Sequence, residues 1–228
     1  MNIVITGANR GVGLALTRAW LGLGATVYAT ARNVAEAQEL FGLAQKHPKT
    51  LRVLALDVTS DVSVKAFASA LGNTVVDVLV NNAGIIGERT NLTESRASDI
   101  LHVFDTNAVG TLRVTQALLA RVSKKTGKLI NITSQMGSIA DNTSGGSYAY
   151  RMSKAALNMA NKSLSVDLAN AGILSVVVHP GWVATDMGGH NAPTPPSQSA
   201  ANIIALTERL TMNDTGKFFH ADGRELPW

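Results

Sequence analysis

A tyrosine and a lysine spaced four residues apart offer the clearest chemistry in the sequence. Tyr150 and Lys154 belong to the run Tyr-Arg-Met-Ser-Lys, and residues four apart lie on the same face of a helix. A free tyrosine has a pKa near ~10, and a neighbouring ammonium favours its ionised form. Beside the hydroxyl of Ser134, such a phenol is suited to moving a proton between a carbonyl compound and its alcohol. Taken alone, a tyrosine and a lysine at this spacing are more often a chance surface pair.

A glycine-rich turn near the start of the chain is typical of a nucleotide-binding loop. It lies between a β-branched run at 2–6 and a helical pattern that begins at Gly11. Glycines there permit a close approach of the backbone, whose N–H groups at a helix N-terminus hold a pyrophosphate. The spacing G-x-x-x-G-x-G departs from the common G-x-G-x-x-G, and an ordinary glycine turn is the alternative interpretation. The predicted cofactor-binding loop contains Gly7, Asn9, Arg10, Gly11, Val12 and Gly13.

The residues that follow the second predicted strand favour NADP(H) over NAD(H). A site that prefers NAD usually has an acidic side chain here for the ribose 2′-hydroxyl. In this chain the first acid is Glu36, whereas Arg32 follows the strand directly and Arg10 lies in the glycine loop. Two cations that face the adenosine ribose would suit a 2′-phosphate. Two unrelated surface arginines are the alternative.

The elements that must position these residues alternate regularly along the chain. Apolar runs predict strands at 2–6, 25–30, 51–56, 75–80, 128–133 and 173–178, with a short one near 216–219. Amphipathic patterns predict helices at 11–24, 34–46, 60–71, 93–122, 148–170 and 197–211. Apolar strands separated by helices indicate a parallel sheet that is covered on both faces. The sequence therefore predicts one α/β domain at 1–228 with a doubly wound parallel sheet, and ligands beyond the carboxyl ends of its strands.

Composition excludes several other kinds of protein. Of 228 residues, 46% are hydrophobic and 16% charged, which provides a large core and rules out wholesale disorder. The chain has no cysteine and its five histidines form no metal-ligand motif, so we expect no metal and no disulfide. The net charge of +4 is not gathered in a basic domain or tail, so we expect no nucleic-acid partner. With no membrane-length apolar run and no signal-peptide pattern, we expect a cytoplasmic protein without a membrane partner.

Motifs along nearly the whole chain resemble, in their order, the short-chain dehydrogenase/reductase family. They are TGANRGVG at 6–13, Asp57-Val58, NNAG at 81–84, Asn107, Ser134, YRMSK at 150–154 and HPGWVATDM at 179–187. Four motifs resemble those of the small carbonyl-reductase-like branch of the family, the sniffer and C-factor type. They are TGANRGVGL, MGSIADN, YAYRMSKAALN and DGRELPW. The resemblance implies a Rossmann fold and an NADP-dependent oxidoreductase. Such an enzyme transfers a hydride between the nicotinamide and a small or hydrophobic carbonyl or alcohol substrate.

The resemblance also implies a role for each matching residue. Tyr150 would donate a proton to the carbonyl oxygen, and Ser134 would hydrogen-bond that oxygen. Lys154 would hold the nicotinamide ribose and lower the pKa of Tyr150, while Asn107 would anchor a water leading to Lys154. The glycines of the loop would line the pyrophosphate. The other implied cofactor contacts are Asp57 and Val58 at adenine, Asn82, Ala83 and Gly84 along the adenosine, and Pro180, Gly181, Val183 and Thr185 around the nicotinamide.

Two serines compete for the role beside Tyr150. The family commonly places its serine about a dozen residues before its tyrosine, and Ser138 lies twelve before Tyr150 whereas Ser134 lies sixteen before it. Ser134, however, directly follows the fifth predicted strand. We favour Ser134 on this position and interpret 141–147 as a small inserted loop that accounts for the longer spacing.

The substrate side is predicted to be mainly apolar. It should be formed by 134–136, by the loop at 141–148 and by the segment 182–196, with Met136, Trp182 and Met187 in its lining. Few charges there suit a small or hydrophobic carbonyl compound. The alternative is that the tryptophan and the methionines are simply core.

Two questions stay open on the sequence alone. A nucleotide-binding signalling or sensor protein on the same fold, similar to C-factor, is the alternative function, although Asn107, Ser134, Tyr150 and Lys154 are all present. Fold analogy by itself does not decide between an enzyme and a sensor. The helical stretches 93–122 and 148–170 often pair between subunits in this family, which implies a homodimer or tetramer. The nearest branch also includes monomers.

Overall fold

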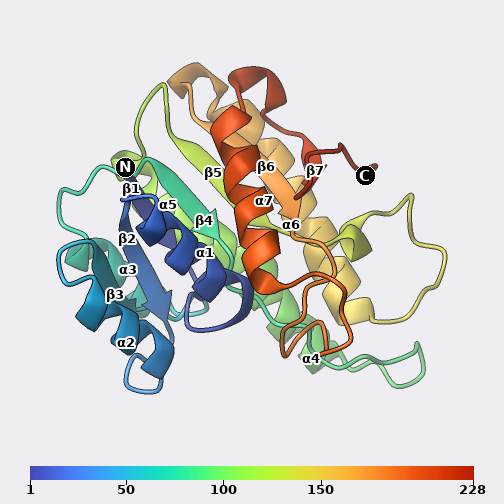
Figure 1. The fold of residues 1–228 in the computed structure, drawn as a ribbon. Coiled ribbons are helices and arrows are strands. Elements are labelled where there is room, and N and C mark those ends of the chain that lie inside the picture. Colours follow the sequence, from blue (N-terminus) through green and yellow to red (C-terminus); the bar gives the residue numbers. More distant parts are fainter.

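The computed structural model describes residues 1–228 and contains one seven-stranded parallel sheet (Figure 1). The strand order is β3-β2-β1-β4-β5-β6-β7, and all neighbouring strands run parallel. The strands are β1 (Asn2–Ile5), β2 (Thr26–Ala31), β3 (Leu51–Ala55), β4 (Val78–Asn81), β5 (Lys128–Ile132), β6 (Leu174–His179) and β7 (Phe218–His220). The chain winds from β1 outward to β3, then returns to β4 and winds the other way. This confirms the predicted doubly wound sheet and places its switch point between β1 and β4.

Helices cover both faces of the sheet. They are α1 (Gly11–Gly22), α2 (Gln38–Lys46), α3 (Asp61–Ala70), α4 (Ala97–Phe104), α5 (Gly110–Leu118), α6 (Tyr148–Asp167) and α7 (Pro196–Arg209). Buried side chains of α1, α2 and α7 join a hydrophobic cluster on one face, and those of α3 and α5 join a second cluster on the other. Figure 1 shows α1 and α7 side by side in front of the sheet. None of the helices combines the length and the apolar character that crossing a membrane requires.

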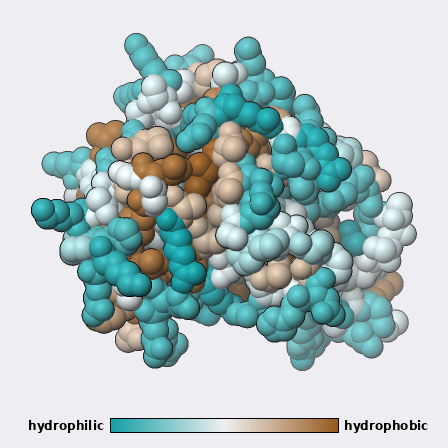
Figure 2. Space-filling model, in the orientation of Figure 1, coloured by the Kyte–Doolittle hydropathy of each residue, from teal (hydrophilic) through white to brown (hydrophobic).

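The strands are buried on both sides, which explains their near-continuous apolar sequences. In β1, Ile3 and Ile5 belong to the cluster under α1 and α7, whereas Val4 belongs to the cluster on the opposite face. All three side chains are fully buried. This alternation follows from the two-residue period of a strand. On the face seen in Figure 2, hydrophobic side chains gather near the middle and hydrophilic ones surround them.

The helix predicted over 93–122 is divided into separate pieces. A loop continues to Arg96, and a π-helical turn, η1 (Asp105–Val109), separates α4 from α5. The turn brings the side-chain amide of Asn107 to the backbone of Ile85. The N–H of Ile85 donates to Oδ1 of Asn107 at 2.8 Å, and Nδ2 of Asn107 donates to the carbonyl of Ile85 at 2.8 Å. These hydrogen bonds to a distant part of the chain stabilise the wider π-helical turn. The spacing of hydrophobic residues in the sequence does not indicate such a turn. Such turns occur frequently at functional sites.

Candidate active site

A cleft of about 1240 Å³ runs along the carboxyl edge of the sheet. Residues that follow β1, β2, β3, β4, β5 and β6 all contribute to its wall, so it spans the switch point. Every predicted site residue lines it except Gly13 and Asn107. The predicted residues in its wall are Gly7, Asn9, Arg10, Gly11, Val12, Arg32, Asp57, Val58, Asn82, Ala83, Gly84, Ser134, Tyr150, Lys154, Pro180, Gly181, Val183 and Thr185.

The glycine loop forms a cradle that has no room for side chains. Gly7 has a φ of +62°, and a Cβ there would lie 2.8 Å from the Cα of Ala83. A side chain on Gly13 would collide with the carbonyl of Gly7 and the amide of Asn82, so only glycine fits at this position. Gly13 itself does not line the cleft. The N-terminus of α1 begins at Gly11 and opens toward the cleft. Free N–H groups and a helix dipole at this position suit an anion such as a pyrophosphate.

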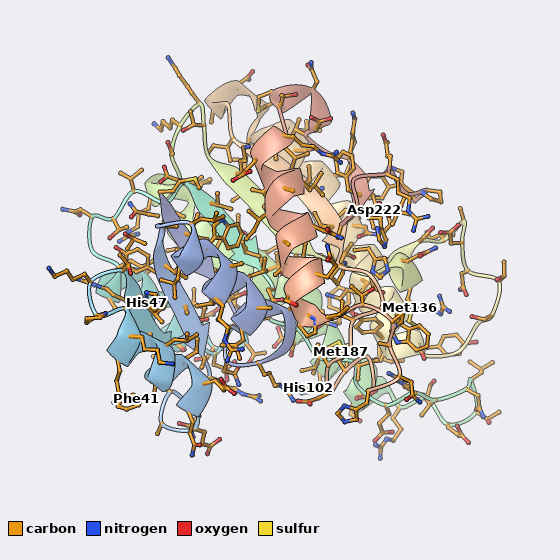
Figure 3. All side chains as sticks on the ribbon, in the orientation of Figure 1. Phe41, His47, His102, Met136, Met187 and Asp222 are labelled. Atoms are coloured by element: carbon orange, nitrogen blue, oxygen red, sulfur yellow. The ribbon has the colours of Figure 1, made fainter.

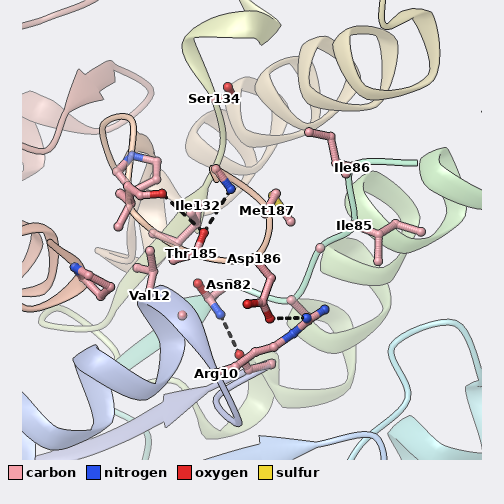
Figure 4. A pocket seen from close by; sticks show the side chains of 18 of the residues that line it. Arg10, Val12, Asn82, Ile85, Ile86, Ile132, Ser134, Thr185, Asp186 and Met187 are labelled. Atoms are coloured by element: carbon pink, nitrogen blue, oxygen red, sulfur yellow. Dashed lines mark hydrogen bonds and ion pairs between the residues drawn. The ribbon is translucent and has the colours of Figure 1, made fainter. Parts of the chain in front are cut away.

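The end of β4 is bonded directly to this loop (Figure 4). The amide of Asn82 donates to the carbonyls of Thr6 and Gly7 at 2.9 and 2.8 Å. The hydroxyl of Thr6 accepts from the backbone N–H groups of Asn82 and Ala83, both at 2.9 Å. The side chain of Asn82 therefore holds the loop in place.

The part of the cleft that follows β2 and β3 contains an acid, Asp57, and a cation, Arg32. Burial alone would raise the pKa of Asp57, but hydrogen bonds from Thr59 and the charges of Arg32 and Arg113 hold that pKa below its ordinary value. Asp57 is therefore an anion that shapes the turn after β3, with Thr59 N and Oγ1 at 2.9 and 2.7 Å. Arg32 forms no ion pair with any acidic side chain.

Arg10, the second predicted cation, is engaged elsewhere. Its Nη1 lies 2.6 Å from Oδ2 of Asp186, across the mouth of the cleft (Figure 4). Both side chains are 67% exposed, so the ion pair is a weak one. Sequence reasoning did not foresee this contact, because the partners are 176 positions apart.

Tyr150 and Lys154 come from the first turns of α6, and both are buried in the cleft wall. Nζ of Lys154 donates to the carbonyl of Ile132 at the end of β5 at 2.8 Å, and it lies 5.7 Å from the centroid of the Tyr150 ring. Burial lowers the pKa of Lys154 to about 8.

In the protein without a cofactor, Lys154 is not among the groups that lower the pKa of Tyr150, so the lowering expected once a nicotinamide is bound stays a prediction. Burial raises the pKa of Tyr150, and this effect exceeds the opposing effects of a hydrogen bond from Ser134 and the charge of Arg89. The physical reason is that a buried phenolate loses its hydration. The hydroxyl is accordingly protonated near neutral pH.

The two competing serines occupy different surroundings. Ser134 lines the cleft beside Tyr150, and its hydroxyl accepts from the backbone N–H of Met136 at 3.2 Å. Ser138 lies outside the cleft wall, where its hydroxyl donates to the backbone carbonyl of Trp228 at 3.0 Å and accepts from the N–H of Asp141 at 3.1 Å. Ser134 therefore shares the cleft wall with Tyr150, whereas Ser138 does not.

Asn107 lies one layer behind the cleft wall and is fully buried. Its amide donates to the carbonyl of Ile85 at 2.8 Å and to the hydroxyl of Ser153 at 2.9 Å. Both amide hydrogens are thus used, and the residue connects the end of β4 to α6. A Cβ on Gly84 would lie 3.1 Å from its Oδ1 and 3.6 Å from Nζ of Lys154, so the three residues are closely packed.

The segment after β6 covers the nicotinamide end of the predicted site. Gly181 has a φ of +91°, and the carbonyl of Pro180 accepts from Ser199 at the start of α7 at 2.7 Å. Trp182 is 60% exposed and lines the cleft, so the alternative that it is a core residue is wrong. Met136 and Met187, both labelled in Figure 3, line the cleft.

Arg89 is a cleft residue that the sequence did not reveal. It lies in the loop between β4 and α4, and its Nη2 donates to the carbonyl of Met187 at 2.8 Å. The Tyr150 hydroxyl in turn faces the sulfur of Met187 at 3.9 Å. An irregular loop has no period and no motif, so its approach to the site could not be read from the residues.

Known proteins are similar to this chain in sequence and in fold. Residues 1–195 match the family described as short chain dehydrogenase. The C-signal of Myxococcus xanthus is 45% identical over 166 residues, which are 72% of this chain and 100% of that protein. The carbonyl reductase Sniffer of Drosophila melanogaster has a TM-score of 0.95 at 36% identity and covers 100% of this chain and 99% of its own. The NADPH-bound carbonyl reductase from chicken fatty liver has a TM-score of 0.94 at 34% identity, with coverages of 100% and 98%.

The family match and the similarity to carbonyl reductases identify an NAD(P)-dependent oxidoreductase on a Rossmann fold. The chain belongs to the short-chain dehydrogenase/reductase family, as its motifs predicted. Its likeness to both Sniffer and C-signal confirms the predicted branch.

Proposed function

We propose that the chain is an NADPH-dependent reductase of small or hydrophobic carbonyl compounds, with Tyr150 as the general acid in reduction and the general base in oxidation. The observation that carries this proposal is the convergence of Tyr150, Ser134 and Lys154 on one wall of the cleft. The three come from the end of β5 and the start of α6. They are buried, so solvent competes little for their hydrogen bonds.

The residues at the other end of the cleft fit a dinucleotide. The glycine loop leaves a cradle that a Cβ would fill, and the N-terminus of α1 supplies N–H groups for a pyrophosphate. Arg32, and Arg10 once it leaves Asp186, would hold the 2′-phosphate. When bound, the nicotinamide would supply the hydride that reaches the carbonyl carbon. Pro180, Gly181, Val183 and Thr185 would hold the ring, and Asp57 and Val58 would contact the adenine.

Tyr150 is in the right state to protonate an oxygen. Because burial raises its pKa, the hydroxyl keeps its proton near neutral pH. It can therefore donate that proton to the carbonyl oxygen, which becomes negative as hydride adds to the carbonyl carbon. Ser134 would donate a second hydrogen bond to that oxygen. Lys154 would hold the nicotinamide ribose, and its charge, with that of an oxidised nicotinamide, would ease removal of the proton in the reverse direction.

The substrate end of the cleft supports an apolar substrate. Ile85, Ile86, Met136, Trp182 and Met187 all contribute to its lining. Apolar side chains that surround a few polar groups are typical of small-molecule sites. A compact hydrophobic aldehyde or ketone, with its carbonyl oxygen toward Tyr150 and Ser134, fits this lining.

A panel of aldehydes and ketones with NADPH tests the proposal, with the absorbance of the reduced nicotinamide as the measurement. We expect turnover of at least one small aromatic or aliphatic carbonyl compound. A second panel with NADH compares the cofactors. If no carbonyl compound is reduced although NADPH binds, the proposal is wrong.

The relationship to C-signal favours a second candidate, a nucleotide-binding signalling or sensor protein. The two candidates differ in whether the protein needs catalytic turnover for its function. A sensor would bind NADPH and change its partner contacts equally well in the wild type and in a Tyr150→Phe variant. An enzyme would lose its function in that variant.

For its surroundings we propose the cytoplasm, since a chain without cysteine fits a reducing compartment. We propose also that it pairs as a homodimer or tetramer. Exposed apolar side chains on α4 and α6 would be covered in such an assembly; they are Leu101, Phe104, Met152 and Met159.

A further inference from the structure

Arg89 places a positive charge at the substrate end of the cleft, where the sequence predicts few charges. It shares the cleft wall with Ser134 and Tyr150. Its guanidinium donates to the backbone of Met187 at 2.8 Å, and the Met187 sulfur lies 3.9 Å from the Tyr150 hydroxyl. One methionine therefore separates the cation from the hydroxyl that would protonate a substrate. Figure 4 shows Met187 beside Ile85 and Ile86 in this part of the cleft.

No acidic side chain neutralises Arg89. It takes part in none of the ion pairs of the chain. The acids next in sequence to Arg89 and to its bonded Met187 are paired with other arginines, Glu88 with Arg96 and Asp186 with Arg10. A guanidinium carries five N–H donors, and Arg89 uses one of its terminal nitrogens on Met187. Donors are left that can reach into the cleft.

The other cation at this end is not available in the same way. Arg151 also lines the cleft, but it donates to the carbonyls of Gly145 and Met136 and to the hydroxyl of Ser144. These three bonds hold the loop before α6 in place. Arg89, in the irregular loop between β4 and α4 and with a single bond, is the cation that can meet a ligand.

We propose that Arg89 is a specificity-determining residue that binds a carboxylate on the substrate. The preferred substrates are then carbonyl compounds with an apolar body and an anionic group. The apolar body would lie against Ile85, Ile86 and Met136, and the carboxylate would take paired hydrogen bonds from the guanidinium. This inference rests on the proposed function and narrows its substrate class.

The electrostatics of the site agree with this placement. The charge of Arg89 is among the influences that lower the pKa of Tyr150, although burial outweighs it. The guanidinium is therefore close enough for its field to act at the hydroxyl. A substrate that presents its carbonyl to Tyr150 would have its carboxylate within the same field.

The test compares 4-formylbenzoate with its methyl ester, which differ in charge and share the reacting aldehyde. For the wild type, we expect a higher kcat/KM for the acid than for the ester, and a decline of that preference as salt is added. Arg89→Met should lower the acid-to-ester ratio of kcat/KM by roughly ten- to a hundredfold, the usual range for a charge-assisted hydrogen bond. Arg89→Lys should restore part of the ratio.

Arg96→Met is the matched control, because Arg96 belongs to the same loop, pairs with Glu88 and lies outside the cleft wall. It removes the same charge and should leave the ratio at the wild-type value. An unchanged ratio in Arg89→Met, or a wild type that prefers the ester, would overturn the inference while turnover of the ester still upheld the proposed function. No turnover of either aldehyde or of any other carbonyl compound would refute both.

Discussion

Replacing Arg32 with alanine should remove most of the preference for NADPH over NADH. Arg32 follows β2, lines the cleft near Asp57 and has no acidic partner of its own, so its full charge is available to a 2′-phosphate. A charge-assisted hydrogen bond contributes about 1.5–3 kcal/mol, which corresponds to roughly ten- to a hundredfold in affinity. We therefore expect Arg32→Ala to weaken NADPH by that factor, and NADH by less than about threefold because NADH lacks the phosphate.

Arg10 provides an internal comparison, because its ion pair with Asp186 must be broken before it can turn to a phosphate. That exposed pair is worth about 0–1 kcal/mol. Arg10→Ala should accordingly cost less NADPH affinity than Arg32→Ala. Asp186→Asn, which frees Arg10, should strengthen NADPH by up to about fivefold and leave NADH unchanged.

Fluorescence titration of the wild type and the three variants with both cofactors, at fixed salt, measures these affinities. Salt must be held constant because a phosphate contact on the surface weakens as ions screen it. An Arg32→Ala variant that loses NADPH and NADH affinity by equal factors would refute the assignment. So would a wild type that binds both cofactors equally well.

Two further predictions concern the catalytic wall. Ser134→Ala should lower kcat at least tenfold more than Ser138→Ala does, because only Ser134 lines the cleft; steady-state kinetics of the two variants decide, and the reverse ranking would move the role to Ser138. Burial lowers the pKa of Lys154 to about 8 from an ordinary 10.5, so across that window the unfolded chain holds a proton that the folded protein has released. The free energy of unfolding should therefore rise with pH from about 8 to about 10 relative to Lys154→Met, measured by urea unfolding; a parallel pH dependence in both proteins would contradict the buried ammonium.

Sequence alone predicted those parts of the molecule whose determinants are contiguous. The apolar run of β1, the glycine loop and the start of α1 follow one another without interruption, so their arrangement could be derived from local rules. The same holds for Tyr150 and Lys154, which one helix places on one face. The doubly wound sheet followed from the repetition of such units.

Features that depend on distant contacts could not be predicted in this way. The ion pair of Arg10 with Asp186 joins the first loop to the segment after β6, and Arg89 reaches Met187 from an irregular loop. The π-helical turn at Asn107 depends on bonds to Ile85 and Ser153 rather than on its own sequence. Spacing places the charge of Lys154 near Tyr150, but it does not show the burial that raises the pKa of this tyrosine in the protein without a cofactor.

Tyr150→Phe tests the central claim most directly, with Tyr148→Phe as the matched control. Tyr148 begins the same helix but lies outside the cleft wall. General acid–base catalysis is typically worth ~10²–10⁴ in rate, so Tyr150→Phe should lose turnover of a carbonyl substrate by about that factor while its NADPH affinity in fluorescence titration stays near the wild-type value. Tyr148→Phe should keep most of its turnover. Reduction at a near wild-type rate by Tyr150→Phe would contradict the assigned mechanism and favour the sensor.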